Sequence, residues 1–83
     1  MKIIVSYDLR APGQNYTSFY RELRCLEAVK ITESCWLIHS QKNVFELRDY
    51  LSQFLDYNDI LFVARTREFS QKNLTVEAID ILT

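Results

Sequence analysis

The stretch that decides the fold is KIIVSYDLR, residues 2–10. Its side chains alternate with the period of two that is typical of a β-strand, with Ile3, Val5 and Tyr7 on one face and Ile4, Ser6 and Asp8 on the other. The turn-forming residues Ala-Pro-Gly follow at 11–13, so the strand is expected to end close to its aspartate. The rest of the chain is organised around this strand, and Asp8 stands at its end.

Length and composition indicate one domain spanning residues 1–83. The chain is 48% hydrophobic with a single glycine and a single proline, a core-forming composition that leaves no room for a flexible linker. The apolar run in MKIIVS is too short for a signal peptide, and no apolar stretch approaches a membrane span. We therefore expect a cytoplasmic protein with no membrane partner. A domain of this size buries only roughly 60–65% of its unfolded surface, so a protein partner would stabilise it.

The charges are nearly balanced. Ten Lys and Arg against eleven Asp and Glu give a net charge of −1, so no global field concentrates nucleic acid at the surface. A local basic patch of Arg10, Arg21 and Arg24 stays open as an interpretation. The alternative is solvated arginines that pair with Glu22 and Glu27.

The two cysteines predict structural thiols. Cys25 and Cys35 lie ten residues apart in a chain with one histidine, which fits neither a zinc site nor a disulfide framework. Both are expected to be free and buried, in keeping with a reducing compartment.

Two helices are predicted. The first begins after Gln14, with Asn15 as its N-cap and an apolar face made by Tyr16, Phe19, Tyr20, Leu23 and Leu26. We interpret these tyrosines as core residues rather than as a platform for stacked bases. The second helix carries a capping box of Asn43 and Glu46 and an apolar stripe of Val44, Leu47, Leu51, Phe54 and Leu55.

Three further strands complete the pattern. Residues 28–32 and 35–40 predict a hairpin or a sharply bulged pair of strands. Residues 60–65, ILFVAR, predict a strand that is apolar on both faces. We expect Ile60, Phe62 and Ala64 to meet the helices, which leaves Leu61 and Val63 in need of cover on the second face of the sheet.

The tail, residues 69–83, can supply part of that cover. Thr75 can cap a short helix that runs to about Leu82, with Glu77 in its first turn and Val76, Ile79 and Leu82 as apolar residues. A helix this short must dock on something to be stable.

The order strand, helix, strand, strand, helix, strand defines the fold class. It predicts an α+β, ferredoxin-like βαββαβ domain: a four-stranded antiparallel sheet with two helices on one face. The core covers residues 1–68, and residues 69–83 form a C-terminal appendage with a short helix.

Three motifs resemble the CRISPR-associated endoribonuclease-like family, the second Cas adaptation protein. These are VSYD at residues 5–8, SCW at 34–36 where the family has Ser-x-Phe, and DILFV at 59–63. The segments YDLRAPGQNY, ESCWLIHS, LDYNDILFV and NLTVEAIDIL are still more similar to stand-alone uncharacterised Cas-like proteins, some labelled "SinR family", that begin with SYDL-x-x-PG-x-x-Y and carry an STWLI hairpin. The chain departs from the family in its helical tail and in lacking a strongly basic surface.

The resemblance implies a homodimer with two sheets packed face to face. It carries the family's paired aspartate over to Asp8, which would hold Mg²⁺ or Mn²⁺ at the two-fold axis for phosphodiester cleavage. One carboxylate is a poor magnesium site, whereas two related by symmetry supply the protein oxygens that Mg²⁺ commonly uses. The alternative for Asp8 is an exposed or capping carboxylate before a turn.

Two functional hypotheses follow. The first is a Cas-like homodimeric module of a prokaryotic, defence-related system that assembles with or binds nucleic acid, RNA or DNA, or a partner protein. The second is an Mg²⁺- or Mn²⁺-dependent endonuclease, preferentially an endoribonuclease, with Asp8 as catalytic metal ligand and Ser6, Arg10 and Ser34 near the phosphate.

The remaining candidates favour structural roles. His39, the single histidine, is interpreted as a surface or interface residue rather than a general acid or base, because no carboxylate stands at a telling spacing. Trp36 is interpreted as a packing anchor rather than a base-stacking residue. The sequence contains no glycine-rich phosphate loop, histidine-rich metal cluster or nucleophilic triad.

Overall fold

A four-stranded antiparallel sheet forms the centre of the protein in the computed structural model, which describes residues 1–11 and 15–83. The elements in chain order are β1 (Lys2–Asp8), α1 (Thr17–Cys25), β2 (Val29–Thr32), β3 (Cys35–His39), α2 (Val44–Ser52), β4 (Ile60–Arg65) and α3 (Val76–Leu82). The strand order is β2-β3-β1-β4, and each neighbouring pair is antiparallel. The predicted α+β class with a four-stranded antiparallel sheet is therefore confirmed.

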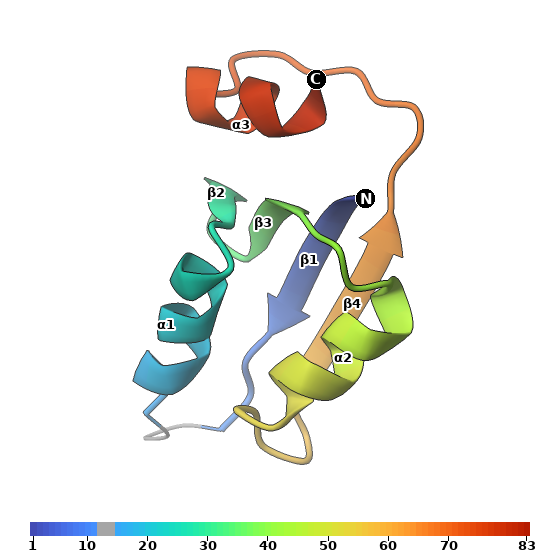
Figure 1. The fold of residues 1–83 in the computed structure, drawn as a ribbon. Helices are drawn as coiled ribbons and strands as arrows, with labels where there is room; N and C mark the ends of the chain where they lie inside the picture. Colours follow the sequence, from blue (N-terminus) through green and yellow to red (C-terminus); the bar gives the residue numbers. More distant parts are fainter. Residues whose placement is uncertain (12–14) are drawn as a thin grey trace.

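The helices lie on both faces of the sheet. Helices α1 and α2 lie on one face, and α3 lies on the other (Figure 1). The larger core fills the space between the sheet and the first two helices and consists of Ile3, Val5, Tyr7, Phe19, Leu23, Trp36, Ile38, Leu47 and Leu51. The apolar faces predicted for the two helices are thus the ones that pack on the sheet.

Trp36 and Tyr7 join β3 to β1 within this core. The indole Nε1–H of Trp36 donates a hydrogen bond of 2.9 Å to the hydroxyl of Tyr7, and both residues are buried. The ring of Phe19 on α1 meets the Tyr7 ring edge-on, with 5.0 Å between centroids. Burial raises the pKa of the Tyr7 hydroxyl. The interpretation of Trp36 as a packing anchor is confirmed.

The predicted orientation of β4 was wrong. Phe62 is opposite Ser6, and Leu61 is opposite Tyr7, whose face carries α1 and α2. Leu61 and Val63 therefore pack on the larger core, while Ile60 and Phe62 lie on the second face. Every position from Ile60 to Ala64 is apolar, so the strand has no alternation of its own, and its register with β1 decides which side chains face the helices.

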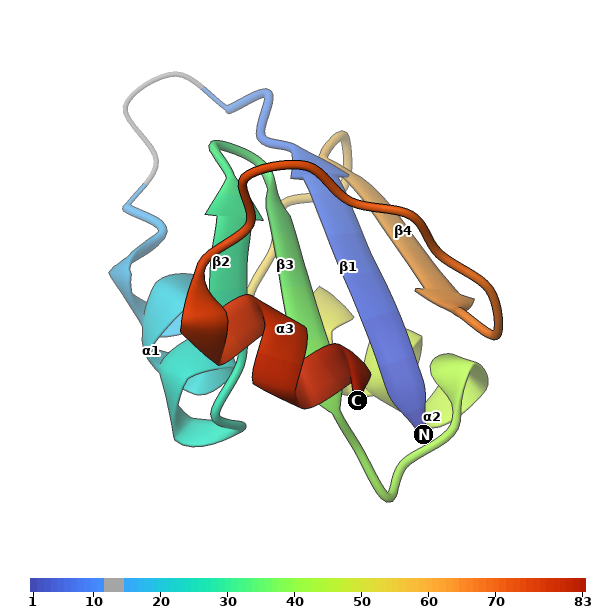
Figure 2. The same cartoon turned by 90° about the horizontal axis from the view of Figure 1, so that it is seen from above.

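Helix α3 covers only half of the second face. Its buried residues Ala78 and Leu82 pack on Leu37, with Ile4, Val29, Ile31, Leu74 and Ile81 partly buried around them. The helix contacts β2 and β3, and β4 lies clear of it (Figure 2). The C-terminal appendage thus packs on the sheet of its own chain and covers half of the second sheet face.

Helices α2 and α3 begin with the N-cap residues predicted from the sequence. The Asn43 side chain accepts a hydrogen bond from the Glu46 N–H, and the Glu46 side chain accepts from the Asn43 N–H, which completes the capping box. Thr75 accepts from the Ala78 N–H at the start of α3. Val76, expected to be apolar cover, is instead exposed, because Ala78 occupies the inner side of the first turn.

The predicted N-cap of α1 needs correction. The N-cap residue is Tyr16, and Asn15 lies one position earlier, where its side chain accepts from the Thr17 N–H and hydroxyl. Residues 12–14, which carry the predicted turn and the predicted helix start at Gln14, lie outside the described residues.

Both cysteines are free, as predicted, but neither is fully buried. Cys25 is exposed, because it lies on the outer side of the last turn of α1. Cys35 on β3 is half-buried.

The hairpin has the predicted strands within one residue at each end. Glu33 and Ser34 form its turn, and the register between β2 and β3 shifts between Lys30 and Thr32. The pair is therefore a bulged hairpin, in which the shift lies on the β2 side of the turn.

Helix α1 ends in a Schellman motif. The Ala28 N–H donates to the Leu23 carbonyl, the Glu27 N–H donates to the Arg24 carbonyl, and Glu27 adopts a φ of 60°. A residue with a Cβ pays roughly 1 kcal/mol for this left-handed conformation, which glycine adopts freely.

We expect Glu27→Gly to stabilise the fold. Relief of the left-handed strain at Glu27 should raise the free energy of unfolding by about 0.5–1 kcal/mol and the melting temperature by roughly 4 °C. Thermal unfolding followed by circular dichroism measures the change. Glu27→Ala keeps the Cβ and is the matched control, so an equal gain from both variants would contradict the prediction.

Candidate functional site at the end of the first strand

Asp8 is the last residue of β1, and its carboxylate is exposed. Its register partner on β4 is Ile60, and it shares the second face of the sheet with Ser6. The alternation that places Ile3, Val5 and Tyr7 under the helices therefore turns the aspartate toward the half of the sheet that α3 leaves open.

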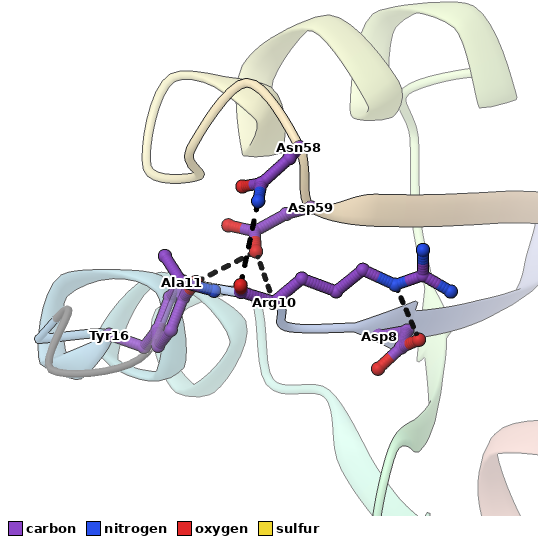
Figure 3. A network of polar contacts seen from close by, with 6 residues as sticks. All are labelled: Asp8, Arg10, Ala11, Tyr16, Asn58 and Asp59. Atoms are coloured by element: carbon purple, nitrogen blue, oxygen red, sulfur yellow. Dashed lines mark hydrogen bonds and ion pairs between the residues drawn. The ribbon is translucent and has the colours of Figure 1, made fainter.

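Arg10 holds the Asp8 carboxylate. The Arg10 Nε donates to Asp8 Oδ2 at 2.9 Å, and both side chains are more than half exposed. Figure 3 shows the arginine side chain running back along the strand end to reach the carboxylate. An exposed ion pair contributes little to stability. Its chemical effect is to place the Arg10 guanidinium on the carboxylate of Asp8, the predicted metal ligand.

The other two predicted site residues lie at the same end of the sheet without joining this pair. Ser6 is opposite Cys35 on β3, two residues before Asp8. Ser34 lies in the hairpin turn, where its carbonyl accepts a hydrogen bond from the Tyr7 N–H at 3.0 Å. Of the four candidates, only Asp8 and Arg10 are in contact among the interactions of the described residues.

Asp59 is the residue that sequence reasoning missed. Its Oδ1 accepts from the Arg10 N–H at 2.7 Å and from the Tyr16 hydroxyl at 2.7 Å, and its Oδ2 accepts from the Asp56 N–H at 2.7 Å. The Tyr16 hydroxyl in turn accepts from the Ala11 N–H at 3.2 Å (Figure 3). One carboxylate thus ties the chain after β1, the start of α1 and the loop before β4 together.

The hydrogen bonds determine the ionisation of Asp59. Partial burial opposes its charge, but the donors from Arg10, Asp56 and Tyr16 outweigh this effect and lower the pKa of the carboxyl group. Burial, together with the hydrogen bond to Asp59, raises the pKa of the Tyr16 hydroxyl. Asp59 therefore accepts all three hydrogen bonds as a carboxylate.

A sequence signal for Asp59 existed but was not decisive. The segment 56–59, Asp-Tyr-Asn-Asp, has a carboxylate three residues after another turn residue, which is typical of a side chain that returns to the backbone. Nothing in the local pattern indicates that Arg10 and Tyr16, more than 40 residues away in the sequence, supply the other donors.

A metal ion needs more ligands than one chain brings to this end of the sheet. The described residues contain no group of three or more His, Cys, Asp or Glu side chains that could hold a metal. The Asp59 oxygens are engaged by three donors, and Asp8 is engaged by Arg10. One protomer does not fit Mg²⁺ or Mn²⁺, and Asp8 could ligate either ion only with a second carboxylate and with Arg10 displaced.

The three arginines considered as a basic patch lie on two segments of the chain. Arg10 follows β1 and pairs with Asp8, while Arg21 and Arg24 are exposed on α1. Their alternative pairing with Glu22 and Glu27 is not seen in the described part of the chain, where Glu22 instead accepts from the Tyr50 hydroxyl. His39 is exposed at the end of β3, as expected for a surface residue.

No protein-family model matches the sequence, and no solved structure matches the chain significantly. The resemblance to the CRISPR-associated family therefore rests on the sequence motifs quoted above. In the parts of the chain that the structure describes, no helix is long and apolar enough to cross a membrane.

We expect Asp59→Asn to destabilise the fold by about 5 °C in melting temperature at pH 7, because the amide places a donor against the Asp56 N–H. The lowered pKa gives the sign of the pH dependence. The carboxylate stabilises the fold above the unfolded pKa of about 4, and this contribution is lost as pH falls through the lower folded pKa.

Thermal unfolding of wild type and Asp59→Asn between pH 7 and pH 3 tests both points. The difference between the two proteins should shrink below about pH 4. Asp80→Asn, which changes an exposed carboxylate on α3, is the control and should melt with the wild type. A difference that stays constant with pH would contradict the assignment to an ionised Asp59.

Proposed function

We propose that the protein is a homodimeric assembly module of the Cas-like, ferredoxin-fold type, acting in the cytoplasm. The element order β1-α1-β2-β3-α2-β4 and the strand order β4-β1-β3-β2 support the ferredoxin-like assignment. The sequence motifs support the family, and with it a defence-related system in a prokaryote. The observation that carries the proposal is the open half of the second sheet face.

Exposed apolar side chains gather on β4, the strand that α3 does not reach. Phe62 is 61% exposed and Ile60 is 46% exposed, both on the second face. The described residues include no strand beyond β4, so its outer edge is unpaired as well. An open apolar face beside a free edge is a typical site of protein association.

A second copy of the chain is the occupant that fits best. Helix α3 shields the β2–β3 half, so the two-layer arrangement is complete on one side and incomplete on the other. A two-fold contact uses one surface twice, so Phe62 of each protomer can lie against the open half-face of the other. This packing gives Ile60 and Phe62 the cover that the single chain lacks.

We expect the wild type to be a dimer at micromolar concentration and Phe62→Asp to be monomeric. A carboxylate in the apolar contact should weaken dimerisation by at least about a hundredfold. Sedimentation velocity over a concentration series measures the dissociation constant. Val76→Asp, which charges another exposed apolar residue, on α3, is the matched control and should remain dimeric.

Two results would refute this interface. A wild type that is monomeric across the micromolar range removes the dimer altogether. A Phe62→Asp variant that dimerises as well as the control moves the contact away from the open face.

The position of Asp8 favours a second candidate, the metal-dependent endoribonuclease. Asp8 lies on the same face as Ser6 and Phe62, at the end of the open half. A two-fold axis near this end would bring two Asp8 carboxylates together, which is the ligand set that one chain does not provide. Arg10 would then exchange the carboxylate for a phosphate oxygen, a ligand that guanidinium groups bind well.

In this candidate, RNA cleavage requires Mg²⁺ or Mn²⁺, and we expect Asp8→Asn to lower its rate by on the order of a hundredfold. Gel assays of a labelled RNA with purified wild type, Asp8→Asn and Asp80→Asn measure it, with Asp80→Asn retaining full activity. Phe62→Asp should lose activity together with dimerisation. Equal cleavage by wild type and Asp8→Asn would exclude Asp8 from the chemistry and leave the assembly role alone.

A further inference from the structure

A hollow lies at the opposite end of the sheet from Asp8. It has a volume of about 280 Å³ and is lined by Met1, Lys2, His39, Arg65, Thr66 and Arg67. Strand β1 runs from Lys2 to Asp8, so the two ends are about 20 Å apart. The hollow is therefore separate from the candidate site described above.

Three neighbouring strands fix the positions of its lining residues. Lys2 on β1 is opposite His39 on β3, so these two side chains share the second face, whereas Arg65 on β4 is opposite Ile3 and belongs to the face of α1 and α2. The Thr66 N–H donates to the Lys2 carbonyl at 2.9 Å, which holds the chain after β4 against the start of β1. The hollow thus lies across the end of the central sheet and takes its lining from both faces.

The lining is strongly cationic although the protein carries a net charge of −1. Lys2, Arg65 and Arg67 contribute three positive charges, and no carboxylate lines the hollow. The ion pairs of the described residues involve Arg10, Lys30 and Arg48 instead. Like charges that gather without a counter-charge repel one another, so a bound anion would stabilise this end of the sheet.

We propose that this hollow binds a phosphate group. The two arginines offer planar forks that match phosphate oxygens, and Lys2 adds a point charge. His39 adds a ring N–H donor. The volume is at the lower limit of small-ligand pockets, roughly 300 Å³, which suits a phosphate or diphosphate group rather than a whole drug-sized molecule.

The phosphate can belong to a free diphosphate or to an oligonucleotide, and the two sources are separated by experiment. Sodium pyrophosphate and a fluorescein-labelled single-stranded RNA of about ten nucleotides are the probes. Isothermal titration measures pyrophosphate binding, and fluorescence anisotropy measures RNA binding, each at low salt. Tighter binding of RNA with a steep salt dependence identifies the nucleic-acid source, and tighter binding of pyrophosphate identifies the free ligand.

The Arg65→Gln/Arg67→Gln double variant should bind whichever of the two probes binds more tightly at least about tenfold more weakly than the wild type does. The matched control is Arg21→Gln/Arg24→Gln, which removes the same charge from the exposed face of α1 and should bind within about twofold of wild type. Arg67 lies outside β4, so Arg67→Gln tests the site without altering a strand. This single variant should weaken binding roughly threefold.

Failure of both probes to bind at about 1 mM, or equal loss in the double variant and its control, would overturn the proposal. The proposal does not depend on the dimer, because Phe62 does not line the hollow. Phe62→Asp should therefore bind the probe as the wild type does, which distinguishes failure of this site from failure of the proposed interface.

Discussion

The pairing of β1 on both of its edges is the constraint on which the rest of the structure depends. Its neighbours β3 and β4 take their register from it, so the alternation of Ile3, Val5 and Tyr7 with Ile4, Ser6 and Asp8 decides which face every adjacent side chain joins. The hydrogen bond from Trp36 to Tyr7 and the edge-on contact of Phe19 lock that choice on the side of α1 and α2. A shift by one residue would turn the whole apolar row toward the other face.

The two faces of the sheet are completed to different extents, and this difference shapes the functional proposals. Two helices close the first face, whereas the seven residues of α3 pack mainly on β2 and β3 of the second. A helix of two turns can bury Ala78 and Leu82, but it cannot span a sheet of four strands. The half-face left over carries Phe62 in its middle, and Ile60 and Asp8 opposite each other at its end.

The ends of the sheet differ in charge. The end at Asp8 carries the carboxylates of Asp8, Asp56 and Asp59, and hydrogen bonds or an ion pair engage each of them. The opposite end gathers Lys2, Arg65 and Arg67 around one hollow. A net charge near zero therefore hides two local fields of opposite sign. Antiparallel pairing produces this separation, because it brings the start of β1 beside the end of β4.

By itself, the sequence determined the number, type and order of the strands and helices, because these follow from local hydrophobic periodicity. It also determined the capping box at Asn43 and Glu46 and the docking of a short helix capped by Thr75, because these caps are side chains that bond the backbone of their own helix. Only the tertiary structure decided that Phe62 faces away from the helices, that Asp59 ties Arg10 to Tyr16, and that the cations gather around Lys2. Each of these depends on strand register or on contacts across more than 40 residues of chain. Neither the register nor such distant contacts can be predicted from the local sequence pattern.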